Sequence, residues 1–133
     1  MTQVTDPSAG MTTQGYDAVG NVVSIVRPNG VTTQMTYDSR NRVTSITERD
    51  PSNAILAAES YTLDALGNRT LVTRNDGSNV QYQYDSLGRV TKEKHLNASN
   101  SVTFESVYAY NAAGKSRHRR HACGAHNLHV QRR

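Results

Sequence analysis

The sequence contains little of what an ordinary globular core is built from. Its 133 residues include no tryptophan, one phenylalanine, one cysteine and three prolines, and only 35% of them are hydrophobic. Soluble domains usually have roughly 45–50% apolar residues, a reference that counts glycine but not tyrosine. A thick aliphatic core is therefore excluded. The sequence offers instead seven tyrosines together with threonine and valine, which are typical of strands on a half-buried sheet.

Helical and targeting signals are also missing. Up to residue 115, no run has apolar residues at the three- and four-residue spacing of an amphipathic helix. The first residues lack the basic start and the apolar stretch of a signal peptide, and no transmembrane segment is expected. The lone Cys123 allows no intrachain disulfide. The expected fold is all-β, made almost entirely of strands and turns.

One short pattern recurs five times. Its clearest copy is residues 82–90, in which Tyr82 and Tyr84 alternate along the chain and Asp85 is followed three residues later by Gly88. Aspartate suits the first position of a type I turn, because its carboxylate can accept hydrogen bonds from backbone N–H groups two residues on. Glycine suits the position after the turn, where the backbone needs a positive φ. The pattern predicts a strand, a tight turn and a returning strand.

The other copies preserve this turn chemistry. Asn41 replaces the glycine in one copy, and asparagine tolerates the left-handed conformation better than other non-glycine residues. Asn111 replaces the aspartate in the last copy and keeps a side-chain acceptor. The structural repeat positions are Tyr16, Asp17, Gly20, Tyr37, Asp38, Asn41, Asp64, Gly67, Tyr82, Tyr84, Asp85, Gly88, Tyr108, Tyr110, Asn111 and Gly114.

The spacing of the copies indicates a larger unit. Successive turns lie alternately 21 and 26 residues apart, which makes a 47-residue period of two hairpins. The shorter members contain compact turn sequences at 27–30 and 74–77, and the longer ones contain polar stretches at 50–53 and 97–101 that predict looser loops. Repeats on this scale indicate an array in which each hairpin packs on its neighbours.

The tyrosines fall in two columns, one and three residues before the aspartate, and therefore share one face of a strand. Side-by-side hairpins would bring these columns into lateral register, where aromatic cross-strand pairs contribute about 0.2–1 kcal/mol each. The column can pack repeats together or form a sugar- or peptide-binding surface, and we favour packing. The returning strand is expected to begin five residues after the aspartate, at Val22, Val43, Arg69, Val90 and Ser116.

The last part of the chain departs from the pattern. From Lys115 onward there are six Lys/Arg residues and no acidic residue, so the formal charge of +4 arises in the tail and the rest carries −2. This distribution makes nucleic acid an unlikely partner for the repeats. We interpret 1–14 as a partial repeat, 15–115 as the repeat region and 116–133 as a basic tail, disordered or out of pattern.

Three further interpretations of the tail remain open. The donors His118, His121, Cys123, His126 and His129 suit zinc, but no paired Cys-x-x-Cys and no apolar segment accompany them, and we predict no metal site. A basic arm that contacts nucleic acid or an acidic surface is the second interpretation. The third is a shift of reading frame after Lys115, in which case another frame of the encoding DNA would resume the strand-and-turn pattern.

The aspartates at 17, 38, 64 and 85 do not form a catalytic set. They recur at one structural position, whereas a catalytic pair needs two carboxylates in different environments. Gly114-Lys115-Ser116 resembles the end of a phosphate-binding loop, but Ala109 stands where the first glycine of that loop belongs. We therefore expect no enzyme activity and no cofactor.

The Tyr-Asp-x-x-Gly-Asn/Arg units, most closely 16–21 and 84–89, resemble the YD repeats of the RHS family over about residues 10–115. Leu63 in place of tyrosine and Asn41 in place of glycine depart from the pattern. The resemblance implies a strip of β-hairpins spiralling into a hollow shell. In bacterial members this shell encloses a C-terminal toxin, and in animal relatives it belongs to cell-surface adhesion proteins. The aspartate-based self-cleavage segment of the bacterial shells is not recognisable here, so no cleavage residues carry over.

The resemblance implies a non-catalytic structural segment of a secreted or cell-surface protein. Its partners would be neighbouring repeats and an enclosed toxin domain; the alternative is an adhesion module whose tyrosine-lined face binds a cell-surface glycan or protein. A short run of hairpins has unpaired edge strands that template association. We expect the chain alone to be marginally stable or prone to aggregation, and a sharp, reversible, monomeric unfolding transition would contradict this.

Overall fold

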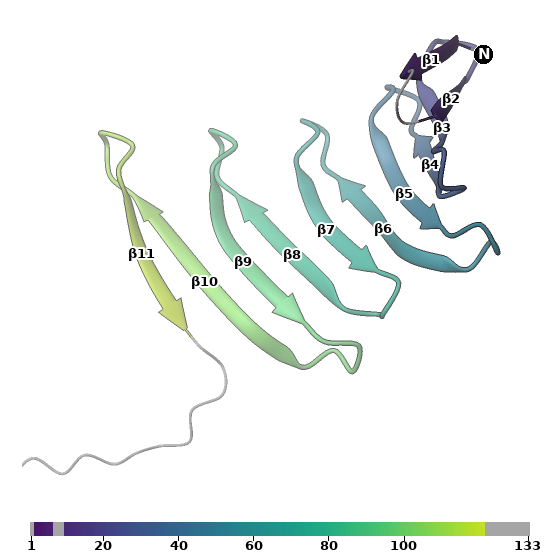
Figure 1. Ribbon diagram of the computed structural model, residues 1–133. Helices are drawn as coiled ribbons and strands as arrows, with labels where there is room; N and C mark the ends of the chain where they lie inside the picture. The colour runs from purple at the N-terminus through teal and green to yellow at the C-terminus, as the bar shows by residue number, and fades with distance from the viewer. Residues whose placement is uncertain (1, 7–9, 122–133) are drawn as a thin grey trace, which may run out of the picture. The chain divides into compact units, whose positions relative to one another are not determined.

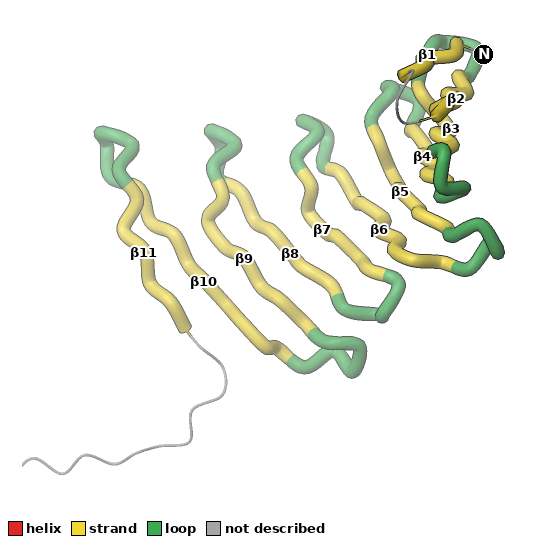
Figure 2. Tube along the Cα trace, viewed as in Figure 1, coloured by secondary structure: helices red, strands yellow, loops and turns green. Residues whose placement is uncertain are grey.

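The computed structural model describes residues 2–6 and 10–121, and throughout these residues the regular structure is β (Figures 1 and 2). The all-β array of hairpins expected from the sequence is confirmed. In this described part of the chain no helix is long and apolar enough to cross a membrane. The chain divides into two units, Met1–Asn75 and Asp76–Arg133, which we call the N-terminal unit and the C-terminal unit.

The N-terminal unit is an antiparallel meander in which each strand pairs with the next along the chain. Its strands are β1 (Thr2–Asp6), β2 (Gly10–Tyr16), β3 (Val22–Val26), β4 (Thr32–Tyr37), β5 (Val43–Arg49), β6 (Ile55–Leu63) and β7 (Arg69–Arg74). The C-terminal unit continues the same pattern. Its strands are β8 (Asn79–Tyr84), β9 (Val90–Leu96), β10 (Val102–Tyr110) and β11 (Ser116–His121).

Each sheet has two distinct faces. Along β8, Val80 is buried and Tyr82 and Tyr84 are partly buried, whereas Gln81 and Gln83 are exposed. Along β4 the same alternation leaves Thr33 buried and Met35 and Tyr37 partly buried. We call the side that carries these covered residues the tyrosine face and the other side the opposite face. The alternation follows from the two-residue period of a strand.

Little of the sheet is buried. The buried apolar side chains of the described residues are Tyr61, Val72, Val80 and Leu96, and the buried polar ones are Thr33 and Ser106. Fully burying one such apolar side chain contributes about 1.5–3 kcal/mol. With so few of them, the backbone ladder and the contacts between neighbouring hairpins must supply much of the stability.

The structure explains the alternation of 21 and 26 residues differently from the sequence analysis. The stretches 50–53 and 97–101 are not looser loops: Asp50 N–H donates to Ala54 O at 2.9 Å and Asn97 N–H to Ser101 O at 3.0 Å. The compact turn at Arg27 closes in the same way, with its N–H 2.9 Å from Val31 O. The longer members differ because β6 and β10 have 9 residues each, whereas β4 and β8 have 6, and because β5 and β9 have 7 each, whereas β3 has 5 and β7 has 6. Longer strands, not looser loops, therefore account for most of the difference.

The predicted starts of the returning strands are confirmed, since β3, β5, β7, β9 and β11 begin at Val22, Val43, Arg69, Val90 and Ser116. The last of these strands lies in the range 116–133 that the sequence analysis assigned to the tail. The chain does not leave the sheet at residue 116, because Ser116–His121 pair with β10, which gives their backbone groups hydrogen-bond partners. The other four Tyr-Asp hairpins have a register shift beside the turn, and the β10–β11 pair has none. Cys123, His126 and His129 lie outside the described residues.

Asn41 tests the backbone requirement of the turn, because its φ is 59° where the other copies have glycine. Replacing Asn41 by alanine or by glycine removes the same side-chain hydrogen bond from Asn21. The difference in unfolding free energy between the two variants therefore measures the backbone strain alone. We expect Asn41→Ala to unfold with a free energy about 1 kcal/mol lower than Asn41→Gly, because only alanine is strained in the left-handed region. Urea unfolding followed by circular dichroism measures this; an alanine variant as stable as the glycine variant would contradict it.

Candidate functional site

The recurring feature of the structure is a turn closed by a carboxylate. At Asp85, Oδ1 accepts hydrogen bonds from the backbone N–H groups of Leu87 at 3.0 Å and Arg89 at 2.9 Å. The Asp85 N–H donates to Arg89 O at 2.9 Å, and Gly88 has a φ of 75°. The same Oδ1 contacts recur at Asp17, Asp38 and Asp64, and Asn111 keeps one of them, from Lys115.

The residue four positions after the aspartate completes this closure, and we call it the clamp residue. Its side chain donates to the second carboxylate oxygen, as in Arg89 Nε to Asp85 Oδ2 at 2.7 Å or Asn21 Nδ2 to Asp17 Oδ2 at 2.8 Å. The clamp residues are Asn21, Arg42, Asn68 and Arg89. Sequence reasoning noted Asn or Arg at this position without assigning it a role. The signal was that both residues carry a side-chain N–H donor.

Clamp residues also connect neighbouring turns. Asn21 Nδ2 donates to Asn41 Oδ1 at 3.0 Å, in the next Tyr-Asp turn along the chain. Arg42 Nη1 donates to Asp64 O at 2.8 Å, in the turn after that. The carboxylate therefore closes its own turn and positions a donor for the adjacent one.

These contacts lower the pKa of all four turn aspartates. For Asp17 and Asp64, the side-chain amide of the asparagine clamp is the largest cause of the lowered pKa. For Asp38 and Asp85, the largest cause is the backbone N–H of the arginine clamp, to which its guanidinium adds. The pKa of each of the four carboxylates is lowered, with either clamp, so no pair among them is separated into an acid and a base.

The tyrosines immediately before the turn bind the preceding hairpin. Tyr37 Oη donates to Val22 O, at the start of β3, and Tyr110 Oη donates to Val90 O, at the start of β9, both at 2.7 Å. The first copy differs, because Tyr16 is exposed and donates to Gln14 Oε1 of its own strand at 2.6 Å. Tyrosine thus joins successive hairpins through its hydroxyl.

Tyrosine rings in neighbouring columns do not stack on one another. The columns lie on alternate strands, about 10 Å apart, because neighbouring strands are about 4.8 Å apart and one strand intervenes. Arginine bridges such a gap: the Arg89 guanidinium lies 4.3 Å from the centre of the Tyr110 ring. Within one hairpin, the Arg69 guanidinium lies 4.1 Å from the Tyr61 ring. Rings and cations therefore alternate where the sequence predicted paired rings.

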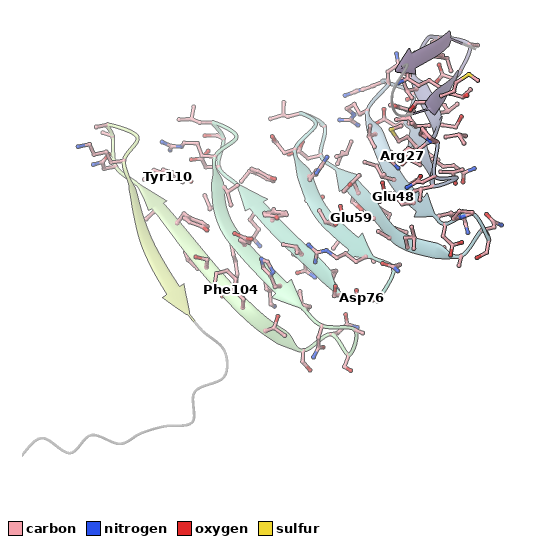
Figure 3. The ribbon with its side chains drawn as sticks, in the orientation of Figure 1. Arg27, Glu48, Glu59, Asp76, Phe104 and Tyr110 are labelled. Atoms are coloured by element: carbon pink, nitrogen blue, oxygen red, sulfur yellow. The ribbon has the colours of Figure 1, made fainter. Side chains whose placement is uncertain are left out.

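Charged groups on the tyrosine face are also paired with one another. Figure 3 labels Arg27, Glu48 and Glu59 among them. In the N-terminal unit, Arg27 contacts Glu48 at 3.3 Å, and Glu59 accepts from Arg74 at 3.2 Å and from Tyr61 at 2.9 Å. Burial, with the Glu59 contact second, raises the pKa of Tyr61. A hollow of about 150 Å³ lies among Ile46, Glu48, Ala57, Ala58, Glu59 and Tyr61. Typical small-molecule sites have about 300–1,000 Å³, so this hollow is small for a substrate.

In the C-terminal unit the corresponding cluster is partly aromatic. His95 Nε2 lies 2.6 Å from Glu93 Oε1, and Tyr108 Oη donates to Glu93 Oε2 at 3.3 Å. The Phe104 ring meets the His95 ring edge-on at 5.1 Å between centroids. The described residues include no group of three or more His, Cys, Asp or Glu side chains that could hold a metal ion. Of the tail donors, the structure describes the backbone of His118 and His121 only.

The repeat pattern and its geometry match a known family. The model of the RHS repeat matches residues 1–32, 16–52 and 64–97, which together are more than half of the chain. The chain belongs to the RHS-repeat family. None of the curated proteins matches it. The family resemblance inferred from the Tyr-Asp units is thereby confirmed.

Solved structures share this RHS-repeat fold. The Tc holotoxin pore of Photorhabdus luminescens, with a mutation in TccC3, aligns with a TM-score of 0.77 at 18% identity over 86% of this chain and 6% of that chain. TcdB2-TccC3 without its hypervariable C-terminal region aligns with a TM-score of 0.68 at 20% identity over 84% of this chain and 7% of that chain. At these identities the likeness establishes the fold. The RHS repeats described here span only a small part of those chains.

The lowered pKa values predict how the RHS turns respond to acid. A carboxylate whose pKa is lower in the folded state stabilises the fold above its unfolded pKa, about 3.9 for aspartate, and loses that contribution as the pH falls through the folded value. We therefore expect the β circular dichroism signal to decrease below about pH 4.

The control for this prediction replaces Asp17, Asp38, Asp64 and Asp85 together by asparagine, which keeps an acceptor at Oδ1, as Asn111 does naturally. The variant removes four titrating groups, so its unfolding free energy should depend less on pH between about 4 and 2. An unchanged acid transition in this variant would assign the transition to other carboxylates.

Proposed function

We propose that this chain is a non-catalytic wall segment of an RHS-type shell that encloses or presents a C-terminal toxin in a secreted or cell-surface bacterial system. One observation carries the proposal: the repeated side chains direct their hydrogen bonds to their own turn or to the adjacent hairpin. Arg42 binds the turn at Asp64, and Tyr110 binds Val90 of the hairpin before it. Side chains used in this way hold hairpins side by side, as a wall requires.

We infer no catalytic role because the turn aspartates are equivalent to one another. The turn aspartates have partners at equivalent positions and the same direction of pKa change, whereas acid–base catalysis needs carboxylates whose pKa values are pushed apart. The 150 Å³ hollow beside Glu48 and Glu59 is small, and each of these carboxylates already contacts an arginine. These features support a structural role for the described residues.

The toxin association is supported by the names of the similar structures. They are described as a Tc holotoxin pore and as TcdB2-TccC3 without its hypervariable C-terminal region, and those descriptions apply to those proteins. For this chain, the proposed partners are neighbouring repeats of a longer array and an enclosed toxin domain. The proposed location, outside the producing cell or at its surface, follows from that association.

The encoding locus tests the shell proposal. We expect further Tyr-Asp hairpins in frame with this chain or in an adjoining frame, and downstream a toxin domain with its immunity gene. Long-read sequencing of the locus, followed by translation in all frames, gives the answer. A locus that encodes no further hairpin on either side would contradict a shell, because these few hairpins cannot close around a cargo.

The second candidate function is an adhesion module that binds a glycan or a protein through the tyrosine face. The observation in its favour is the aromatic group of the C-terminal unit, where the Tyr82 and Tyr84 rings lie 6.5 Å apart and Phe104 meets His95. Aromatic faces commonly stack on sugar rings, and such a patch remains available if the chain is displayed at a surface.

A glycan-array screen of the parent chain and of Tyr82→Ala/Tyr84→Ala separates the two functions. A wall segment should bind no glycan through the tyrosine face, so any glycan binding should be the same in the parent and the double variant, and the double variant should lose thermal stability because two partly buried rings are removed. An adhesion module should bind a defined glycan set and lose that binding while its circular dichroism spectrum and unfolding temperature stay unchanged. The second result would overturn the assignment as a wall.

A further inference from the structure

The opposite face of the C-terminal unit carries a polar patch that the wall contacts do not use. Gln81 and Gln83 of β8 stand opposite Lys94 and Lys92 of β9 in the strand register. The two glutamines are exposed and the two lysines are partly exposed. These four side chains line a hollow of about 90 Å³, and we call them the lysine–glutamine patch.

The charges around this patch leave one cation available. Lys92 Nζ contacts Glu105 Oε1 at 3.0 Å. Lys94 stands opposite Glu105 in the register of β9 and β10, yet it has no ion pair with any residue in the described part of the chain. Among the described side chains of these two rows, the two lysines therefore outnumber the single carboxylate, Glu105.

We propose that the lysine–glutamine patch binds an anionic polysaccharide, whose sulfate or carboxylate groups contact Lys92 and Lys94 and whose hydroxyls contact Gln81 and Gln83. Ammonium groups supply charge-assisted hydrogen bonds to the anionic groups. Glutamine amides both donate and accept hydrogen bonds, which suits sugar hydroxyls. A flat sheet face with donors two residues apart along each strand can follow an extended polymer.

The chemistry of this face favours a polysaccharide over a nucleic acid. Single-stranded nucleic acid is held largely by bases stacked on aromatic rings. The rings of the C-terminal unit, such as Tyr82, Tyr84 and Phe104, alternate with Gln81 and Gln83 or lie in the cluster with His95 on the tyrosine face. The patch itself has no ring among its four residues.

The corresponding face of the N-terminal unit is different in chemistry. A hollow there is lined largely by small and hydroxyl-bearing residues, among them Ser45, Thr47, Ser60 and Thr73, and its one cation, Arg74, is paired with Glu59, which also lines it. Hydroxyls can bind sugars but do not attract anions, so the proposed selectivity for an anionic chain belongs to the C-terminal unit. This proposal is independent of the shell proposal and also of the adhesion candidate, which uses the tyrosine face.

The test is binding of the full chain to heparin, to neutral dextran and to a single-stranded oligonucleotide of matched charge, measured by biolayer interferometry at two salt concentrations. Because residues 115–133 carry six Lys/Arg residues, the matched control is Arg132→Gln/Arg133→Gln, which removes two positive charges, as many as Lys92→Gln/Lys94→Gln removes. We expect heparin affinity to fall about tenfold for the lysine pair and less than about twofold for the arginine pair. Dextran should not bind.

The single variant Lys94→Gln separates a loss of binding from a loss of folding, because it leaves the contact between Lys92 and Glu105 in place. This variant should keep the circular dichroism spectrum of the parent and bind heparin about threefold more weakly. Equal losses in the lysine and arginine pairs would overturn the proposal in favour of general attraction to net charge. Tighter binding of the oligonucleotide than of heparin, or no binding of heparin, would also overturn it.

Discussion

The structure depends on the closure of its turns by a carboxylate. In a sheet with few buried apolar side chains, an unpaired turn would leave backbone N–H groups without partners and the strands without a fixed register. Asp85 satisfies two such N–H groups with one oxygen and binds its clamp residue with the other. Asp50 and Asn97 use the same Oδ1 contacts at the other end of the hairpins. Both ends of the strands are therefore set by side chains, not by a hydrophobic core.

The closure is coupled to packing between hairpins. At the end of the hairpins opposite the Tyr-Asp turns, a Cβ placed on Gly30 would lie 2.8 Å from Pro51 Cγ, so this glycine is required by its neighbour as well as by its φ of 80°. At the Tyr-Asp end, Arg42 reaches the next turn and Tyr37 reaches the preceding hairpin. One hairpin therefore contacts mainly its neighbours, and stability accumulates along the array as it does in other repeat proteins.

The sequence was sufficient for the features that follow from local backbone chemistry. Asp85 and Gly88 revealed a turn, and Asn41 revealed that the turn needs a positive φ, because few residue types meet these requirements. The longer spacing was misread, since Asp50-Pro51-Ser52-Asn53 has loop-like composition but forms a turn closed by Asp50, and the extra residues lie in β5 and β6. Composition does not reveal where a strand ends when its partner strand can supply further backbone hydrogen bonds. The same reason explains β11, whose residues lack strand character but find partners on β10.

The contacts that connect hairpins could not be inferred, because they depend on the lateral offset of neighbouring turns. A tyrosine column on one strand face was visible in the sequence, but the distance to the next column depends on the strand between them. With β9 intervening, Arg89 rather than a second ring covers Tyr110. The two central turn positions, by contrast, contribute only backbone atoms to the closure, and side chains such as Leu66 and Leu87 are 80% and 74% exposed. Only a few positions in each hairpin are therefore constrained, and a chain of this family can keep its backbone while most of its sequence changes.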